Sequence, residues 1–547
     1  MTQYYIATNF FTSTMGQNAD QEKSAPQAFV RESTGLVKNV SFLDTITLNL
    51  SNMSIGPLLA TVAGSTVATM VIVPTVTGLN LVAASIIAFI LSVPQIVVYT
   101  IMTRRYPRTG GDYVWLSRTF GGFWGSTLSF WGYTMETTAF IALVAILLDF
   151  AIGSVFLTQG NTSAWVFNLF SVPGTQFEFA AVIFTIVIAI NIIRPKAGFR
   201  LVSILALFGI LSLVLAIGVL FSAGQTGIAN YVTSLGLNGA KITPTSSGLS
   251  FLINGTSTYT PSGAPFDINW TNTIFVLPVV FAFVYPWLNA APAVASEIKG
   301  KSAMKWNVPI SAVVAFVLLT ACFATLYAVA GMPFINAAFS NTTYAADGLN
   351  FFTLAMGVSG TGSALSWIIG IGWIAMQLGT IAYAVIVISR YLLAQSLDRF
   401  LPGRLSYVSQ RFGSPIIAHA VDYIVTIVLI ALATYYYASY SALFGAILAS
   451  MIYFIFIGLA ATVHAVRKEK GGAMLALALA GILDMGVFAF ISYQYLANPA
   501  FTGLNNLTYT FLVATLIAGA AIYLASSWYH KKQGIDISLN YKELPPE

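Results

Sequence analysis

Charged side chains are scarce in this 547-residue chain. Only 8% of its residues are Asp, Glu, Lys or Arg, whereas soluble domains contain roughly 25%. A soluble fold of this length would have too few charges to cover its surface, and its exposed apolar surface would drive aggregation. Because 57% of the residues are hydrophobic, the composition indicates a protein whose outer surface faces lipid.

Cysteine and histidine are also nearly absent. The single cysteine, Cys322, excludes an intrachain disulfide and a cysteine-based metal site. The three histidines, His419, His464 and His530, lie far apart in the sequence and predict no metal cluster. The chain has no phosphate-binding G-x-x-x-x-G-K-[ST] run and no cluster of residues with catalytic spacing. We therefore expect no enzymatic activity, no cofactor and no resident metal.

Long apolar stretches define the architecture. A helix needs about 20 apolar residues to cross the hydrocarbon core of a bilayer. Twelve such stretches occur, near residues 42–73, 79–103, 122–156, 177–194, 197–223, 271–296, 306–331, 363–396, 415–437, 441–466, 473–495 and 507–529. They predict an all-α integral membrane protein with about twelve transmembrane helices, embedded in the lipid bilayer of the cell membrane.

Basic residues are distributed unevenly between the two sides of these spans. With the N-terminus inside, 23 of the 24 Lys and Arg residues fall on inner segments or adjoining helix ends, and only Lys241 falls outside. The positive-inside rule predicts this bias, so both termini are expected to be cytoplasmic. The basic residues form no single stripe, and we expect no nucleic-acid partner. The outer segments 224–270 and 332–362 are predicted to be long loops.

Two spans contain a proline near their middle. The first span contains residues 52–57 (NMSIGP), and the sixth contains residues 283–289 (FVYPWLN). Proline removes a backbone donor but suits the first turn of a helix, so Pro57 and Pro286 are predicted to start second half-helices. One kink alone needs no ligand. Two kinks at matching places indicate two inverted five-helix repeats, a fold that binds substrate where its broken helices meet.

The broken helices also suggest which chemistry the site binds. The N-terminus of a half-helix offers free N–H groups to a carboxylate, and unwound carbonyls suit an ammonium group or a cation. A zwitterion fits both ends. The aromatic residues at the sixth break are expected to be substrate contacts or gate residues. The candidate substrate-binding residues are therefore Asn52, Ser54, Ile55, Gly56, Tyr285, Trp287 and Asn289.

Several segments resemble those of amino acid–polyamine–organocation (APC) permeases. Residues 105–114 (RYPRTGGDYV) resemble the YPxxGGxY loop after the second helix of that superfamily. Residues 389–402 (SRYLLAQSLDRFLP), followed by residues 413–415 (GSP), resemble the segment after the eighth helix. Residues 281–283 (FAF) and Glu297 are similar to the sixth helix with its terminal glutamate.

This resemblance implies a five-plus-five inverted-repeat fold with discontinuous helices one and six and two added C-terminal helices. It also implies alternating access, substrates with an amino group, and a site lined by the first, third, sixth and eighth helices. The sequence departs from the superfamily in two places. It has NMSIG where many relatives have Gly-Ser-Gly, and residues 201–223 lack the lysine that some proton-coupled relatives carry. Either H⁺ or Na⁺ therefore remains a possible coupling ion.

The presence of charged residues within the spans requires an explanation, because insertion of a charge at mid-membrane is costly. Glu136 in the third span resembles the glutamate of cationic-amino-acid-type members, and it is interpreted as a coupling residue or a substrate partner, or else as a packing residue. Glu297 ends the sixth span beside two lysines and is interpreted as a cytoplasmic gate or a packing ion pair. Asp44, His419 and Asp422 lie near span ends and are expected to face the membrane interface.

The predicted organisation is a cytoplasmic tail (1–40), a ten-helix transport core (41–470), two further transmembrane helices (471–530) and a second cytoplasmic tail (531–547). The predicted function is secondary active transport of amino acids or related amines. The alternatives are an exchanger of amino acids or polyamines without ion coupling, or a transceptor-like sensor or channel on the same fold. No coiled-coil or dimerisation signature indicates an oligomer.

Overall fold

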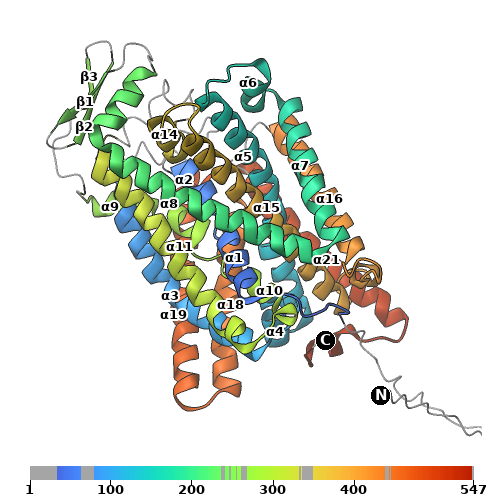
Figure 1. Ribbon diagram of the computed structural model, residues 1–547. Helices are drawn as coiled ribbons and strands as arrows, with labels where there is room; N and C mark the ends of the chain where they lie inside the picture. Colours follow the sequence, from blue (N-terminus) through green and yellow to red (C-terminus); the bar gives the residue numbers. More distant parts are fainter. Residues whose placement is uncertain are drawn as a thin grey trace, which may run out of the picture.

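The computed structural model describes residues 34–62, 79–235, 241–245, 248–253, 256–259, 266, 268–331, 334, 349–437, 443 and 445–544, which form a bundle of long helices (Figure 1). Within these described residues, ten helical segments are long and apolar enough to cross a membrane. They are α3 (Leu81–Arg105), the continuous run α4 (Asp112–Ser129), η2 (Phe130–Met135) and α5 (Glu136–Thr158), α7 (Pro173–Ile193), α8 (Pro195–Ser234), α11 (Lys301–Ala330), α15 (Ala364–Leu397), α16 (Ile416–Ala431) with η6 (Leu432–Tyr437), α18 (Ile447–Lys468), α19 (Gly471–Ala497) and α21 (Asn506–Lys532).

The remaining two predicted spans are both interrupted. The first consists of α1 (Phe42–Asn52) and α2 (Ile55–Val62). The sixth consists of α9 (Trp270–Val284) and α10 (Ala290–Ala293), followed by the 3₁₀ turn η4 (Ala295–Glu297). Together with the ten long segments they give the twelve predicted spans, which confirms the fold class. The predicted end of the first span, residues 63–73, lies outside the described residues.

Two glycines in left-handed backbone conformations mark where predicted spans meet polar helical extensions. The run that begins at Asp112 breaks at Gly121 (φ 79°), immediately before the predicted third span. Helix α8 breaks at Gly224 (φ 58°), immediately after the predicted fifth span. Glycine adopts positive φ without steric cost, so each break separates a membrane segment from a helix that continues in a new direction.

The two predicted outer loops contain regular structure that the sequence reading missed. A three-stranded antiparallel sheet occupies part of the first, and Ile242 and Leu249 in it are buried. The second ends in a short buried helix. Eight-residue helices and short hairpins fall below the length that marks a membrane span, which is why hydropathy did not detect them. The additional elements are α6 (Ala164–Ser171), β1 (Lys241–Thr245), β2 (Gly248–Ile253), β3 (Thr256–Tyr259), α14 (Phe351–Val358), η5 (Gly403–Ser406), α20 (Pro499–Thr502) and η7 (Ile537–Tyr541).

The packing of the spans follows the expected inverted repeat. Four of the first five spans pack against the span five places later, and three of these pairs are α3 against α11, α5 against α15, and α7 against α16. The broken helices pair in the same way, with α1 against α10 and α2 against α9. The two interrupted spans therefore lie antiparallel, with their breaks at the same level.

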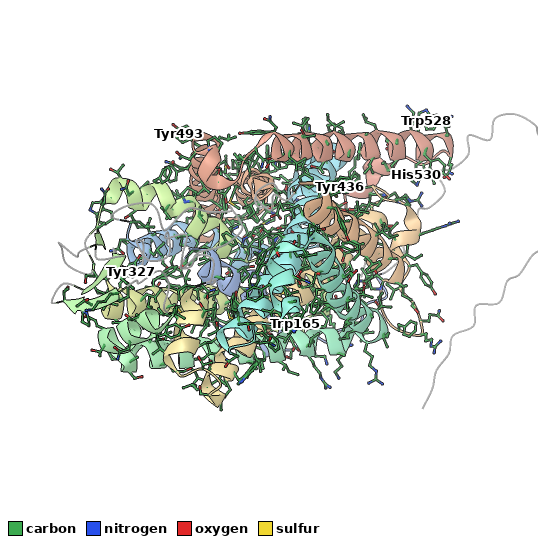
Figure 2. The ribbon with its side chains drawn as sticks, turned by 90° about the horizontal axis from the view of Figure 1, so that it is seen from above. Trp165, Tyr327, Tyr436, Tyr493, Trp528 and His530 are labelled. Atoms are coloured by element: carbon green, nitrogen blue, oxygen red, sulfur yellow. The ribbon has the colours of Figure 1, made fainter. Side chains whose placement is uncertain are left out.

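The end of the bundle opposite the sheet, here called the basic end, carries residues 34–41, 105–111, 298–301, 398–415 and 533–544. Figure 2 shows Trp528 and His530 at this end of α21, on the side opposite Tyr327. The segment after α21 folds back onto the bundle: Asn540 donates to the Asp398 carbonyl (3.1 Å), and Tyr541 is buried. Part of the predicted C-terminal tail is thus ordered and packs against the bundle.

The expectation that polar residues near span ends face the interface is wrong for two of the three. His419 and Asp422 on α16 are both buried, and the Asp422 carboxylate accepts a hydrogen bond from Thr426 (3.2 Å). Only Asp44 is partly exposed, and its carboxylate accepts from the backbone amide of Ser41, the N-cap residue of α1, at 3.0 Å. The reason is that α16 packs against α5, α7 and α15, so that part of its surface never meets lipid.

Candidate functional site

The first break lies between Asn52 and Ile55. Ser54 adopts a positive φ of 41°, which ends one helix and starts another. Helix α2 begins at Ile55, so Pro57 lies in its first turn, where its missing N–H costs nothing. The first intrahelical hydrogen bond of α2 runs from the Leu58 amide to the Ser54 carbonyl at 3.0 Å, so the amides of Ile55 and Gly56 precede it.

The sixth break differs from its prediction. Helix α9 ends at Val284, residues 285–289 are not helical, and α10 starts only at Ala290. Pro286 therefore lies within the unwound segment and does not start the second half-helix. Its carbonyl accepts hydrogen bonds from the Gln95 side chain (3.1 Å) and from the Leu288 amide (2.9 Å). Pro286 therefore contributes a hydrogen-bond acceptor to the break and not the start of a helix.

Asparagine side chains connect the two breaks. Asn52 donates through Nδ2 to Oδ1 of Asn289 at 3.0 Å, and both residues are buried. One turn earlier, Oδ1 of Asn49 accepts from the backbone amide of Ala291 at 2.9 Å. The Oδ1 atom of Asn52 is buried and has no hydrogen-bond partner among the described residues. An unpaired buried acceptor is costly, so Asn52 keeps one unsatisfied acceptor at the first break.

The aromatic candidates at the sixth break face different neighbours. The indole Nε1 of Trp287 donates to the Ala282 carbonyl at 2.6 Å, and the ring stacks on Phe140 of α5 with centroids 6.1 Å apart. The Tyr285 hydroxyl instead hydrogen-bonds to Ser85 of α3 at 2.7 Å. Trp287 therefore connects the break to the third span, whereas Tyr285 connects it to the second.

A small cavity lies beside the first break. It has a volume of about 30 Å³ and is lined by Ser54, Ile55 and Gly56 together with residues of α8, α11 and α15. Neither Tyr285, Trp287 nor Asn289 is in its lining. Ligand pockets in proteins measure roughly 300–1,000 Å³, so the structure shows this region closed.

Comparison with known proteins identifies the family. A family profile described as "Amino acid permease" matches residues 40–525. The chain belongs to the amino acid permease family. Members of this family are transporters and not enzymes, and transport of amino acids follows from membership. No curated protein matches the chain. Among the described residues of the permease, no three His, Cys, Asp or Glu side chains gather as metal ligands would.

The permease contains a buried carboxylate hub that the sequence reading missed. Asp112, the first residue of α4, accepts hydrogen bonds from the hydroxyls of Tyr99 (2.5 Å), Tyr453 (2.8 Å) and Tyr391. Asn289 approaches the same carboxylate at 3.4 Å. The hub therefore links α3, α4, α15 and α18 to the asparagine pair at the two breaks. The only signal in the sequence was an acidic residue directly after the glycine pair of the YPxxGGxY-like loop.

The glycine pair explains how the hub reaches the breaks. A Cβ atom on Gly111 would lie 2.9 Å from the backbone nitrogen of Ala293, and one on Gly110 would lie 2.5 Å from Cβ of Ala394. The loop therefore passes between α10 and α15 too closely for any side chain. The Gly110 amide donates to the Ala293 carbonyl at 2.9 Å, which fixes this passage.

Glu136 lies directly after the π-helical turn η2 in the third span. It is fully buried, one carboxylate oxygen accepts from Thr137 at 3.2 Å, and the other has no partner among the described residues. Tyr133, one turn before it, lies against Tyr391 of the hub, with ring centroids 4.2 Å apart. Phe140, one turn after it, stacks on the sixth-break tryptophan. Glu136 thus lies between the hub and the break.

Glu297 forms a buried ion pair at the basic end. Its two carboxylate oxygens accept from Nε and Nη2 of Arg390 at 2.9 and 3.0 Å. Both side chains are at most 5% exposed. The sequence placed Glu297 beside Lys299 and Lys301, but its partner is on α15. The pair joins the end of the sixth span to the eighth.

Proposed function

We propose that this permease is a secondary active transporter that moves an amino acid or related amine by alternating access, with substrate bound between the two helix breaks. The observation that carries the proposal is the hydrogen bond between Asn52 and Asn289, which joins the two interrupted spans at their breaks. Broken helices that meet near mid-membrane are the recurrent substrate site of inverted-repeat transporters.

The two breaks offer complementary charge to a zwitterion. The N-terminus of α2 presents the amides of Ile55 and Gly56, which suit a carboxylate. The C-terminus of α9 presents carbonyls, and the free Oδ1 of Asn52 adds an acceptor for an ammonium group. The full set proposed to line the open site is Asn52, Ser54, Ile55, Gly56, Tyr285, Trp287 and Asn289.

The closed cavity implies that the transport cycle must enlarge this region. We propose that rearrangement of the broken spans opens it, with the Glu297–Arg390 pair acting as a gate between the sixth and eighth spans. We further propose that the basic end is cytoplasmic and the membrane is the cell membrane. Most basic residues outside the spans are at that end, as the positive-inside rule requires.

Purified protein in liposomes, tested with a panel of labelled amino acids and polyamines, examines this function directly. Saturable uptake of at least one amine-bearing compound, absent from protein-free liposomes, is expected. Liposomes preloaded with the same compound separate exchange from net transport. Uptake that rises linearly with concentration for every compound would indicate a channel and contradict the proposal.

A methyl group on Gly56 is expected to impair transport. The Cβ atom of Gly56→Ala would lie 2.8 Å from Cβ of Met376, at the wall of the cavity. One methyl group in a binding pocket changes specificity by roughly 10- to 200-fold, so kcat/KM should fall at least about tenfold for the transported substrate. The fall is measured by initial uptake rates.

The control for that variant is Gly218→Ala on α8, where an added Cβ atom would meet nothing within 4 Å. It should transport like the wild type. Met376→Gly removes the clashing atom, so Gly56→Ala/Met376→Gly should recover part of the lost rate. Equal loss in Gly56→Ala and Gly218→Ala would show that the cavity wall has no special role.

Glu136→Gln tests the coupling role of Glu136. If this carboxyl group carries a proton during transport, the substitution should remove the pH dependence of uptake, because glutamine cannot titrate. Uptake is measured across a range of external pH values, with Asp484→Asn on α19 as the control, since Asp484 is also a fully buried acid. Unchanged pH dependence in Glu136→Gln would make Glu136 a packing residue.

A further inference from the structure

A large cavity at the basic end has a strongly positive lining. Its volume is about 740 Å³. Five of the residues that line it are basic, and none of its described lining residues is acidic: the basic residues are Lys38, Arg104, Arg108, Lys301 and Lys305. None of the residues proposed to bind substrate lines this cavity, although Ser296 in its lining is next to the proposed gate residue Glu297.

Three separate segments bring these cations together. The segment before α1 is held beside the sixth span, because the Lys299 amide donates to the Val40 carbonyl at 2.9 Å. The loop between α3 and α4 is held to the same region by an isolated bridge between Thr109 and Val294. The third segment is the first turn of α11. Backbone contacts therefore fix the walls of the cavity independently of its charged side chains.

Four of the five cations in this cavity have no ionic partner among the described residues. Two acidic residues lie close in sequence to these cations, and both have other partners: Glu297 pairs with Arg390, and Asp112 accepts the tyrosine hydroxyls of the hub. No carboxylate of the described residues forms an ion pair with Lys38, Arg104, Lys301 or Lys305. By contrast, the neighbouring Arg105 is paired with Glu469 at 2.6 Å.

The positive-inside rule accounts for the number of basic residues at this end but not for their arrangement. It acts on the loops as a whole and does not require five cations to gather in one hollow. Like charges repel each other, and the repulsion is relieved when a multivalent anion binds. The hollow is therefore better explained as an anion site than as a by-product of topology.

An apolar face continues from the cavity along α11. Trp306, in the cavity lining, is 46% exposed, and Val313 and Val317 are 49% and 55% exposed. Spacings of seven and four residues place these three side chains on one side of the helix. An anionic head group in the cavity would thus have a lipid-facing surface beside it for its acyl chains.

We propose that this cavity binds a phosphate-bearing anion, either the head group of an anionic phospholipid or a free phosphate compound. One guanidinium group can donate two parallel hydrogen bonds to a phosphate, and each lysine ammonium adds a positive point charge. Basic pockets between helices at the cytoplasmic side are known to hold anionic lipid head groups. A phosphate here would connect the segment before α1, the α3–α4 loop and the start of α11.

The test compares Lys301→Gln/Lys305→Gln with Arg404→Gln/Lys470→Gln. Both variants remove two exposed basic residues, but only the first pair lines the cavity. In one arm, the full-length protein is titrated with phosphatidylglycerol in phosphatidylcholine nanodiscs. In the other, pyrophosphate is added to protein in phosphatidylcholine alone. The readouts are the rise in melting temperature and the lipids retained in native mass spectrometry, and neither depends on transport.

The cavity variant should weaken anion binding at least about tenfold, as expected for two lost charges near a lipid surface, and the control should bind like the wild type. Selective loss in the lipid arm alone identifies a lipid head group. Loss in both arms identifies a site open to free phosphate. Lys301→Arg/Lys305→Arg should retain binding, which separates charge from folding. Equal weakening in both double variants, or no binding by the wild type in either arm, would overturn the proposal.

Discussion

Asp112→Asn is expected to lose about 3–6 kcal/mol of stability, because hydrogen bonds to a charged group contribute about 1.5–3 kcal/mol each and an amide can replace only one of the two acceptor oxygens. Each oxygen of Asp112 has two donors: Tyr391 and Tyr453 on one, Tyr99 and Asn289 on the other. Whichever oxygen the NH₂ group replaces, the two donors that were bonded to that oxygen then face another donor and lose their acceptor. The total stability of a domain is only about 5–15 kcal/mol, so this loss should be conspicuous in denaturant unfolding.

The same change should also impair transport, because Asn289 would lose an acceptor that holds it against Asn52. We expect kcat/KM to fall by more than tenfold on the basis of about 1.4 kcal/mol for each factor of ten. Tyr453→Phe removes a single donor and should cost roughly half as much stability.

Asp484→Asn is the matched control for Asp112→Asn. It makes the same chemical change at another fully buried carboxyl group, whose two oxygens have no hydrogen-bond partner among the described residues. Because no hydrogen-bond donor relies on the Asp484 carboxyl group, the free energy of unfolding of Asp484→Asn should differ little from that of the wild type. If Asp112→Asn unfolds and transports like Asp484→Asn, the hub does not hold the two breaks in place.

The hub also shows how far the sequence could predict the structure. Apolar length and proline position were enough to predict twelve spans and to locate both interruptions, since these properties are local to each segment. The tyrosines of the hub are separated from Asp112 by 13, 279 and 341 residues. Contacts at such distances depend on how the spans pack, and a hydropathy pattern does not contain that information.

The candidate site was predicted in part for the same reason. Asn52 and Asn289 were both selected because they flank a break, and the structure brings them together. Tyr285 was selected on the same argument, yet its hydroxyl turns toward Ser85. The direction of a side chain in an unwound segment depends on its neighbours from other helices. Pro286 was misplaced because proline can interrupt a helix without starting the next one.

The second large effect concerns the Glu297–Arg390 pair. Removal of one partner from a buried ion pair leaves an uncompensated charge and costs about 3–5 kcal/mol, whereas replacement of both partners by apolar residues is often neutral. Glu297→Met and Arg390→Met should therefore each destabilise strongly. The double variant Glu297→Met/Arg390→Met should recover most of the loss, which a double-mutant cycle in denaturant unfolding measures.

The matched control is Arg105→Met, which breaks the ion pair with Glu469. The Arg105 side chain is 51% exposed, and an exposed pair contributes only about 0–1 kcal/mol. If Arg390→Met is no more destabilising than Arg105→Met, the inner pair does not stabilise the closed arrangement. The same conclusion follows if the double variant is as unstable as the two single variants combined.

The double variant also separates stability from gating. If the pair acts as a gate between the sixth and eighth spans, apolar replacement should retain the fold but loosen the basic end. A cysteine introduced at Ser296, which is 8% exposed beside the gate, reports on this in a Cys322→Ala background, because Cys322 is the only native cysteine. The reporter should react with a water-soluble maleimide severalfold faster in Glu297→Met/Arg390→Met than in the parent. Equal labelling rates together with recovered stability would mean that the pair only packs the sixth span against the eighth and controls no opening.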